Sequence, residues 1–130
     1  MPEENVEIVK RVYHDWARGD FSPVDDFAPD IDFEMVDWPH QTRVTGIEAM
    51  WETWRSTLGA WTGFRSVADE ITGFGNRVLV LNRIVGRGKE SGADVSADTA
   101  TVFTLEDGRI VRMALYWDRD SAKREAEGQD

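Results

Sequence analysis

The chain has 130 residues, enough for one domain with a sizeable core, and its lack of cysteine excludes disulfides, thiol nucleophiles and cysteine metal sites. Its formal charge of -10 opposes binding to nucleic acid, and its acidic, polar start lacks the pattern of a signal peptide. We therefore predict one soluble, cytoplasmic domain over residues 1–130, with no nucleic acid, membrane, metal or cofactor as a partner.

The first element is predicted to be a helix over residues 2–18. Pro2 and the acidic residues after it suit the first turn of a helix, and Gly19 suits its end. Apolar residues recur at intervals of three and four, which places on one stripe Val6, Val9, Tyr13 and Trp16.

A short second helix is predicted over residues 22–27, because a serine precedes a proline at its start and an acid follows the serine by three positions. Residues 30–37 then alternate between acidic and apolar side chains. This pattern predicts a strand whose buried face carries Ile31, Phe33 and Met35. Continuing the alternation places Asp37 on the same face.

A third helix is predicted to begin at Thr45-Gly46-Ile47-Glu48, which has the pattern of a capping box. Its apolar stripe is rich in tryptophan and consists of Ile47, Met50, Trp51, Trp54, Leu58 and Trp61. Tryptophan buries a large area but fills irregular space poorly. The stripe therefore suits either a bulky core or the wall of a cavity, and both interpretations stay open.

The rest of the chain predicts four consecutive antiparallel strands: residues 64–72, residues 78–87 and the two arms of a hairpin over residues 95–118. The hairpin has the strongest local signal, because Asp107-Gly108 suits the positive φ angles of a tight turn. In the preceding strand Asn82 and Arg83 must point to opposite faces, and parity alone leaves open which one faces the interior.

Alternation along the two arms places Thr101 and Phe103 on the same side of the sheet as Met113 and Trp117. The opposite, outer sheet face is predicted to be apolar too, with Leu79, Leu81, Val85, Val102 and Tyr116. The predicted order leaves no helix to cover that face, so we expect a homodimer through it. The charged residues 119–130 are predicted to form a short helix that frays.

This order of elements resembles the nuclear transport factor 2-like superfamily, and in detail its SnoaL-like branch, which includes polyketide cyclases. The residues that carry the resemblance are 5–13 (NVEIVKRVY), 18–20 (RGD), 27–30 (FAPD), 44–46 (VTG) and 103–111 (FTLEDGRIV). The resemblance covers nearly the whole chain. It implies a cone-shaped α+β barrel in which three N-terminal helices pack on a curved, mostly antiparallel sheet around a cavity.

The resemblance indicates the fold and not the reaction, because the superfamily includes isomerases, cyclases, epoxide hydrolases, dehydratases and non-catalytic binders. Its steroid isomerases use a tyrosine of the first helix, an aspartate of the first strand and an acid late in the sheet. By this resemblance the tyrosine position falls on Val12, the first-strand aspartate falls near Met35, and the acid late in the sheet falls on Thr101. None of these has the required side chain, so we reject the steroid isomerase interpretation.

The candidates for acid/base chemistry are Asp37, Tyr13 and His40. Burial of Asp37 beside apolar side chains would raise its pKa toward the range useful for proton transfer. Tyr13 and His40 are candidates for donating or accepting a hydrogen bond at the cavity. Each residue also has a purely structural interpretation. Asp37 could be satisfied by hydrogen bonds in the turn at Trp38-Pro39, Tyr13 could be a core residue, and His40 could be an ordinary loop residue.

A pocket for a small hydrophobic molecule is predicted to be lined by Val12, Trp16, Phe33, Met35, Trp54, Thr101, Met113 and Trp117. Two functions stay open. One is cofactor-independent acid/base catalysis of the isomerase, cyclase or hydrolase type on a hydrophobic compound, and the other is a non-catalytic ligand-binding or dimerisation module. A buried Asp37 facing an open pocket would favour the enzyme, whereas a cavity filled by tryptophans would favour the binding module.

Overall fold

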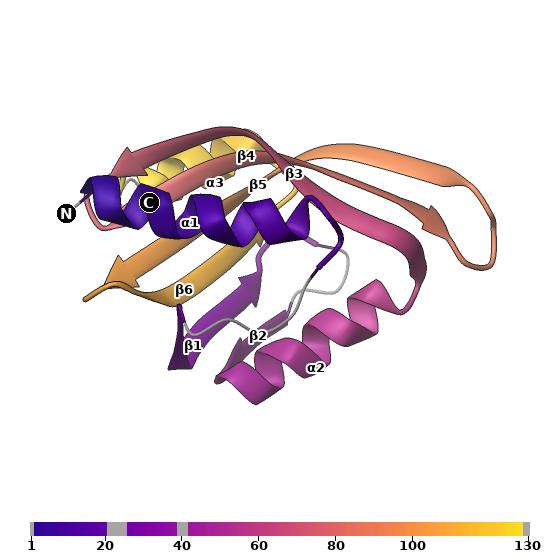
Figure 1. Cartoon of the computed structure of the whole chain (residues 1–130), viewed down its shortest axis with the longest axis horizontal. Coiled ribbons are helices and arrows are strands. Elements are labelled where there is room, and N and C mark those ends of the chain that lie inside the picture. The colour runs from indigo at the N-terminus through magenta and orange to yellow at the C-terminus, as the bar shows by residue number, and fades with distance from the viewer. Residues whose placement is uncertain (1, 21–25, 39–41, 129–130) are drawn as a thin grey trace.

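The computed structural model describes residues 2–20, 26–38 and 42–128. The described elements are, in chain order (Figure 1), α1 (Pro2–Trp16), β1 (Phe27–Met35), β2 (Thr42–Thr45), α2 (Ile47–Leu58), β3 (Trp61–Phe74), β4 (Arg77–Gly88), β5 (Asp94–Glu106), β6 (Arg109–Tyr116) and α3 (Arg119–Ala126). The strands form one sheet in the order β2-β1-β6-β5-β4-β3. β1 runs parallel to β6, and the other neighbouring pairs are antiparallel. The predicted α+β class is confirmed.

The prediction of three N-terminal helices is wrong. Among the described residues α1 alone precedes the first strand, α2 follows β2, and α3 lies at the C-terminal end of the chain. The predicted helix over residues 22–27 lies largely outside the described residues, but its last position, Phe27, begins β1. Phe27 pairs with Ile110 of β6 in the sheet, so a long-range pairing decides its conformation.

Helix ends differ from the predictions in detail. α1 ends at Trp16 and not at residue 18, because the chain leaves the helix through a turn in which the Gly19 N–H donates to the Trp16 carbonyl at 3.0 Å. α2 begins at Ile47 as expected, but Gly46 occupies its N-cap position at φ 102° and no side chain caps the helix. The predicted capping box is therefore not formed.

The β5–β6 hairpin is confirmed. Asp107 and Gly108 have φ angles of 51° and 79°, the left-handed pair that a two-residue hairpin turn requires. The predicted faces hold over most of both strands, since Phe103 and Met113 are buried together in the main core. Alternation places Ile110 on the face opposite Met113, but a register shift after Thr104 changes the alternation and turns Ile110 inward as well.

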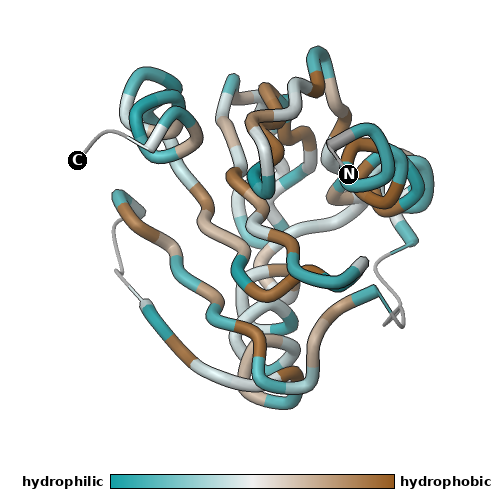
Figure 2. Tube along the Cα trace, turned by 90° about the vertical axis from the view of Figure 1, so that its left-hand side faces the viewer, coloured by the Kyte–Doolittle hydropathy of each residue, from teal (hydrophilic) through white to brown (hydrophobic). Residues whose placement is uncertain are grey.

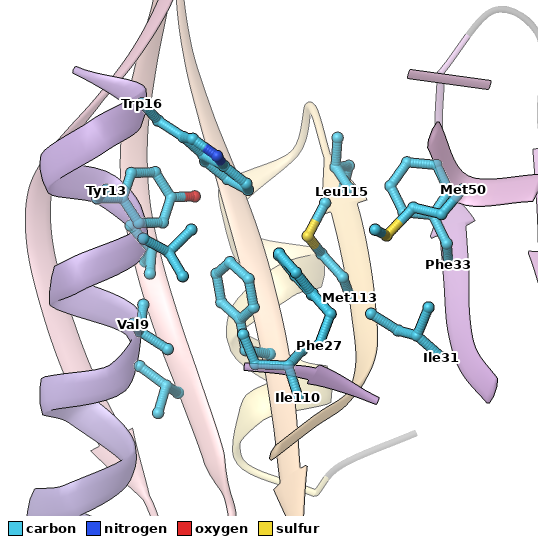
Figure 3. Packing of buried hydrophobic residues seen from close by; sticks show 14 of the residues in the cluster. Val9, Tyr13, Trp16, Phe27, Ile31, Phe33, Met50, Ile110, Met113 and Leu115 are labelled. Carbon is cyan, nitrogen blue, oxygen red and sulfur yellow. The ribbon is translucent and has the colours of Figure 1, made fainter. Parts of the chain in front are cut away.

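The sheet separates two apolar layers. α1 and α2 pack on its inner face, and α3 packs on the outer one, so that the helices near the two chain ends lie on opposite sides (Figure 2). In the main core Tyr13 and Trp16 point from α1 toward the interior, where Met113 and Leu115 of β6 lie (Figure 3). The apolar stripe predicted for the first helix is confirmed by the near-complete burial of Val9, Tyr13 and Trp16.

The outer face has a helix after all. Ala122 and Ala126 of α3 pack on a second apolar cluster formed by Leu79, Ala100, Val102, Ala114 and Tyr116. The expectation that no helix covers this face is therefore wrong, because the short C-terminal helix turns back onto the sheet. The homodimer through this face stays a prediction.

An ionic network holds α3 to the sheet. The Arg112 guanidinium on β6 contacts Asp32 at 2.9 Å, Glu34 at 2.8 Å and, from α3, Glu125 at 3.1 Å. The Tyr116 hydroxyl donates to Glu125 at 2.6 Å. Partial burial acts to raise the pKa of Asp32, but hydrogen bonds and charge from Arg43 and Arg112 outweigh it and hold this pKa below its usual value. The network joins β1, β6 and α3.

No helix in the described part of the chain combines the length and the apolar character needed to cross a membrane.

Candidate functional site

A small internal cavity lies between α1, α2 and the inner face of the sheet. Its volume is about 10 Å³, room for about one water molecule. We call it the inner cavity; it is lined by Tyr13, Trp16, Trp38, Trp54, Ser66, Asn82, Ile84, Thr99, Ala100, Thr101, Met113, Leu115 and Tyr116. The aromatic rings fill most of the space inside the cone, as shown by the centroid distances of 5.0 Å from Tyr13 to Trp16 and 6.4 Å from Trp16 to Trp54.

A polar cluster forms one wall of the inner cavity. Asn82 of β4 donates from Nδ2 to Ser66 Oγ of β3 at 2.9 Å, and Thr101 of β5 donates to Asn82 Oδ1 at 3.3 Å. Thr99 donates to the Asn82 carbonyl at 3.4 Å. Antiparallel pairing of β3, β4 and β5 brings these side chains to one face, and each is at most 4 % exposed. Buried hydroxyls and amides of this kind can hydrogen-bond a ligand oxygen.

Tyr13 projects from α1 into the inner cavity opposite this cluster and is 3 % exposed. Its hydroxyl has no hydrogen-bond partner of good geometry in the described structure. Burial raises the pKa of Tyr13, and the nearby Thr101 and Ser66 side chains offset only part of that effect. The phenol is therefore neutral at physiological pH and is available as a hydrogen-bond donor.

The residues predicted to line the pocket separate into three groups. Trp16, Trp54, Thr101 and Met113 line the inner cavity. Val12 and Phe33 are buried in the main core and line neither hollow. Met35 and Trp117 instead line a second, open hollow of about 720 Å³, the outer groove, which is formed by Met35, Trp38, Thr42, Glu52, Thr53, Ser56, Thr57, Ala60, Trp61 and Trp117.

Asp37 does not share the buried face of β1. The strand ends at Met35, the Val36 N–H donates to the Leu115 carbonyl at 3.0 Å, and Asp37 is exposed. Its carboxylate accepts from the backbone N–H of Trp117 at 2.6 Å and of Asp118 at 2.9 Å. The predicted burial of Asp37 is therefore wrong, because the end of the strand breaks the alternation on which it depended. Asp37 stabilises the turn between β6 and α3.

His40, the third catalytic candidate, lies outside the described residues. Sequence reasoning did not select Ser66 or Thr99 as site residues and left Asn82 open. Alternation along the strand does predict that Thr99 shares the face of Thr101, but the contact of Ser66 with Asn82 depends on the pairing of β3 with β4 and on a bulge between Ala68 and Glu70.

Replacing Asp37 by alanine should lower the free energy of unfolding by about 1–2 kcal/mol, because two backbone N–H groups lose a charged acceptor. Urea denaturation at neutral pH measures the loss. Asp98→Ala is the matched control, since Asp98 is exposed on β5 and makes no side-chain hydrogen bond in the described structure. Equal effects of the two substitutions would show that Asp37 does not hold the turn.

Comparisons with known proteins agree with this architecture. The model of the SnoaL-like domain family matches residues 9–113. A structure from Jannaschia sp. CCS1, named as a SnoaL-like polyketide cyclase, aligns over 99 % of this chain and 95 % of its own with a TM-score of 0.78 and 21 % identity. An epoxide hydrolase of the LEH-like type from M. tuberculosis aligns over 96 % and 90 %, with a TM-score of 0.71 and 22 % identity.

TerC, crystallised with polyporic acid, aligns over 97 % of this chain and 99 % of its own, with a TM-score of 0.76 and 19 % identity. No curated protein matches the chain in sequence. At these identities the structural neighbours establish the fold alone. The family model, however, covers most of the chain, and the protein therefore belongs to the SnoaL-like domain family.

Proposed function

We propose that this protein binds a small hydrophobic molecule in the inner cavity. The observation that carries the proposal is the buried Tyr13 hydroxyl, which lies among aromatic rings near Thr101 and Ser66 but makes no hydrogen bond of good geometry within the described residues. Small-molecule sites are mostly apolar with a few placed polar groups, and this wall has that composition. A ligand oxygen would supply the acceptor that Tyr13 lacks.

The inner cavity is too small to admit an organic ligand without rearrangement. About 10 Å³ holds no organic molecule, so a ligand has to displace some of the aromatic side chains that fill the cone. Trp38 is the most exposed of the lining tryptophans, because Trp16 and Trp54 are only 6 % and 5 % exposed. A cavity filled by tryptophans favours the binding module over a preformed catalytic pocket.

Acid/base catalysis of the isomerase, cyclase or hydrolase type is the second candidate. Polyketide cyclase and epoxide hydrolase names among the structural neighbours favour it. Among the described residues that line the inner cavity, Tyr13 and Tyr116 are the ionisable ones, and no carboxylate lies there. In this second candidate Tyr13 would donate a hydrogen bond to a substrate oxygen without a cofactor, and Asp37 would take no part.

Replacing Tyr13 by phenylalanine separates binding from stability. Because it removes a buried hydroxyl that makes no well-formed hydrogen bond in the described structure, the change should leave the free energy of unfolding unchanged or raise it by about 1 kcal/mol. It should also weaken binding of oxygen-bearing ligands by about 3- to 10-fold, the effect of one hydrogen bond. Thermal unfolding and calorimetric titration of hits from a screen of oxygenated aromatic compounds measure both quantities.

Tyr116→Phe is the matched control. Tyr116 also borders the inner cavity, but its side chain belongs to the outer cluster and its hydroxyl donates to Glu125, so loss of this hydroxyl should destabilise the protein by about 1 kcal/mol and change ligand affinity less than Tyr13→Phe does. If Tyr13→Phe destabilises as much as Tyr116→Phe and leaves every affinity unchanged, the cavity proposal is wrong. Turnover of a bound compound by wild type, lost in Tyr13→Phe, would favour the catalytic candidate.

We also propose that the protein forms a homodimer through the outer sheet face and that it is cytoplasmic. The partly exposed side chains of Leu81 and Val85 support the homodimer, because α3 packs on the neighbouring cluster without burying them fully. Light scattering during size-exclusion chromatography would show a monomer if this part of the proposal is wrong.

A further inference from the structure

The outer groove is a separate hollow on the other side of one aromatic side chain. Trp38 lines both the inner cavity and the outer groove, and it packs against Trp117 with ring centroids 5.0 Å apart and planes inclined by 48°. The two rings therefore form the partition between the hollows. Trp61 and Met35 extend the apolar surface of the groove, whose volume of about 720 Å³ is that of a small-molecule site.

The two tryptophans that separate the hollows each carry a hydrogen-bond donor, the indole N–H. The indole N–H groups of Trp38 and Trp117 are buried, and neither has a hydrogen-bond partner in the described part of the chain. A buried donor without an acceptor costs free energy, which a ligand oxygen at the partition would recover. Both side chains line the groove and are partly exposed, so binding requires one of the rings to turn its N–H toward the groove.

The negative charge in and around the outer groove disfavours an anionic ligand. The groove contains the exposed acid Glu52, and the chain carries a formal charge of -10, so an anionic ligand would be repelled. Thr53 and Thr57 on the α2 wall direct their hydroxyls to carbonyls of their own helix, at 2.9 and 3.2 Å. These two threonine hydroxyls are therefore already engaged and compete little with the indole N–H groups for a ligand oxygen.

We propose that the outer groove binds a flat, uncharged aromatic molecule with a carbonyl oxygen, which stacks on one of the Trp38 and Trp117 rings and accepts a hydrogen bond from the indole N–H of the other. Aromatic rings stack on tryptophan at a gain beyond the area that they bury. The site goes beyond the inner cavity, because it requires neither Tyr13 nor the polar cluster. Trp38 and Trp117 determine its specificity for an oxygen-bearing ligand.

The test compares two probes of the same shape, 2-acetylnaphthalene and 2-isopropylnaphthalene, of which only the ketone carries an acceptor. Calorimetric titration of wild type should show about 3- to 10-fold tighter binding of the ketone. Trp38→Phe and Trp117→Phe keep an aromatic ring but lose the N–H. The smaller ring removes the same stacking area from both probes, so at least one of these variants should abolish the preference for the ketone.

The six indole N–H signals in a proton–nitrogen correlation spectrum locate the probe. The ketone should move the signals of Trp38 or Trp117, each assigned by its phenylalanine variant. The Trp51 signal should stay in place, because this indole N–H is also buried without a partner among the described residues but Trp51 lines neither hollow. Ser56→Trp fills the groove with a ring from α2 and should abolish binding of both probes.

Three results would overturn the proposal: equal affinities of wild type for the two probes, binding of neither probe up to its solubility limit, or unchanged binding by Ser56→Trp. Tyr13→Phe distinguishes the two hollows. If that substitution removes the preference for the ketone while Trp38→Phe and Trp117→Phe keep it, the probe lies in the inner cavity. The groove proposal is then wrong and the cavity proposal stands. If Tyr13→Phe has no effect, the groove proposal survives a failure of the cavity proposal.

Discussion

Replacing Arg112 by methionine should lower the free energy of unfolding by about 3–5 kcal/mol, the largest effect that we expect from one polar side chain. Arg112 is 21 % exposed, and its three carboxylate partners Asp32, Glu34 and Glu125 are 21–27 % exposed. Without the guanidinium these acids repel one another, and α3 loses one of its bonds to the sheet. Urea denaturation at pH 7 measures the change.

Arg43→Met is the matched control. Arg43 contacts the same acids, with its closest approach of 2.8 Å to Asp32, but its side chain is 64 % exposed. Screening by water limits such a pair, so this substitution should cost much less than Arg112→Met. Similar losses in the two variants would show that the network acts as a surface ion pair.

The loss in Arg112→Met should depend on pH. Because the folded-state pKa of Asp32 is lowered, its contribution to stability is present above the unfolded pKa and is lost as pH falls through the folded value. Arg112 is one of the two side chains that lower it. The advantage of wild type over Arg112→Met should therefore shrink as pH falls below about 4, the ordinary pKa of aspartate, toward the lowered folded-state pKa of Asp32. Urea titrations repeated between neutral pH and acid check this; a constant difference would contradict it.

Replacing Phe103 by alanine should cost about 3–5 kcal/mol, because the side chain is fully buried and its removal leaves a void in a packed core. The ring lies 6.0 Å from Tyr13 and 6.4 Å from Trp16, measured between centroids. The void would adjoin two residues that line the inner cavity. Benzene should therefore raise the melting temperature of Phe103→Ala more than that of wild type.

Phe74→Ala is the control for this prediction, since Phe74 is a partly buried ring packed against the outer cluster and distant in the fold from Tyr13. It should cost less than Phe103→Ala, and benzene should not restore its stability. A loss for Phe103→Ala no greater than for Phe74→Ala would indicate that the inner core collapses around the missing ring instead of keeping the void.

Local patterns were sufficient to predict several elements of this protein. Asp107-Gly108 predicts the hairpin because the turn conformation is a property of those residues alone. Intervals of three and four predict the stripe of α1, and alternation predicts the shared face of Thr101, Phe103 and Met113. The lining of the inner cavity was partly predictable. Its residues Trp16, Trp54, Thr101 and Met113 belong to helices and strands whose periodic patterns show which face is buried.

Other features of this protein depend on contacts between segments that are distant in the sequence, and local patterns did not predict them. β2 was missed because its four residues carry no apolar run, and it is ordered by pairing with β1. Asp37 left the predicted face because β1 ends where its pairing with Leu115 ends, and α3 covers the outer sheet because Arg112 and Tyr116 hold Glu125. The partition of Trp38 and Trp117 joins side chains from opposite parts of the chain. Periodicity describes which face a residue takes within its own element, whereas these features depend on how separate elements meet.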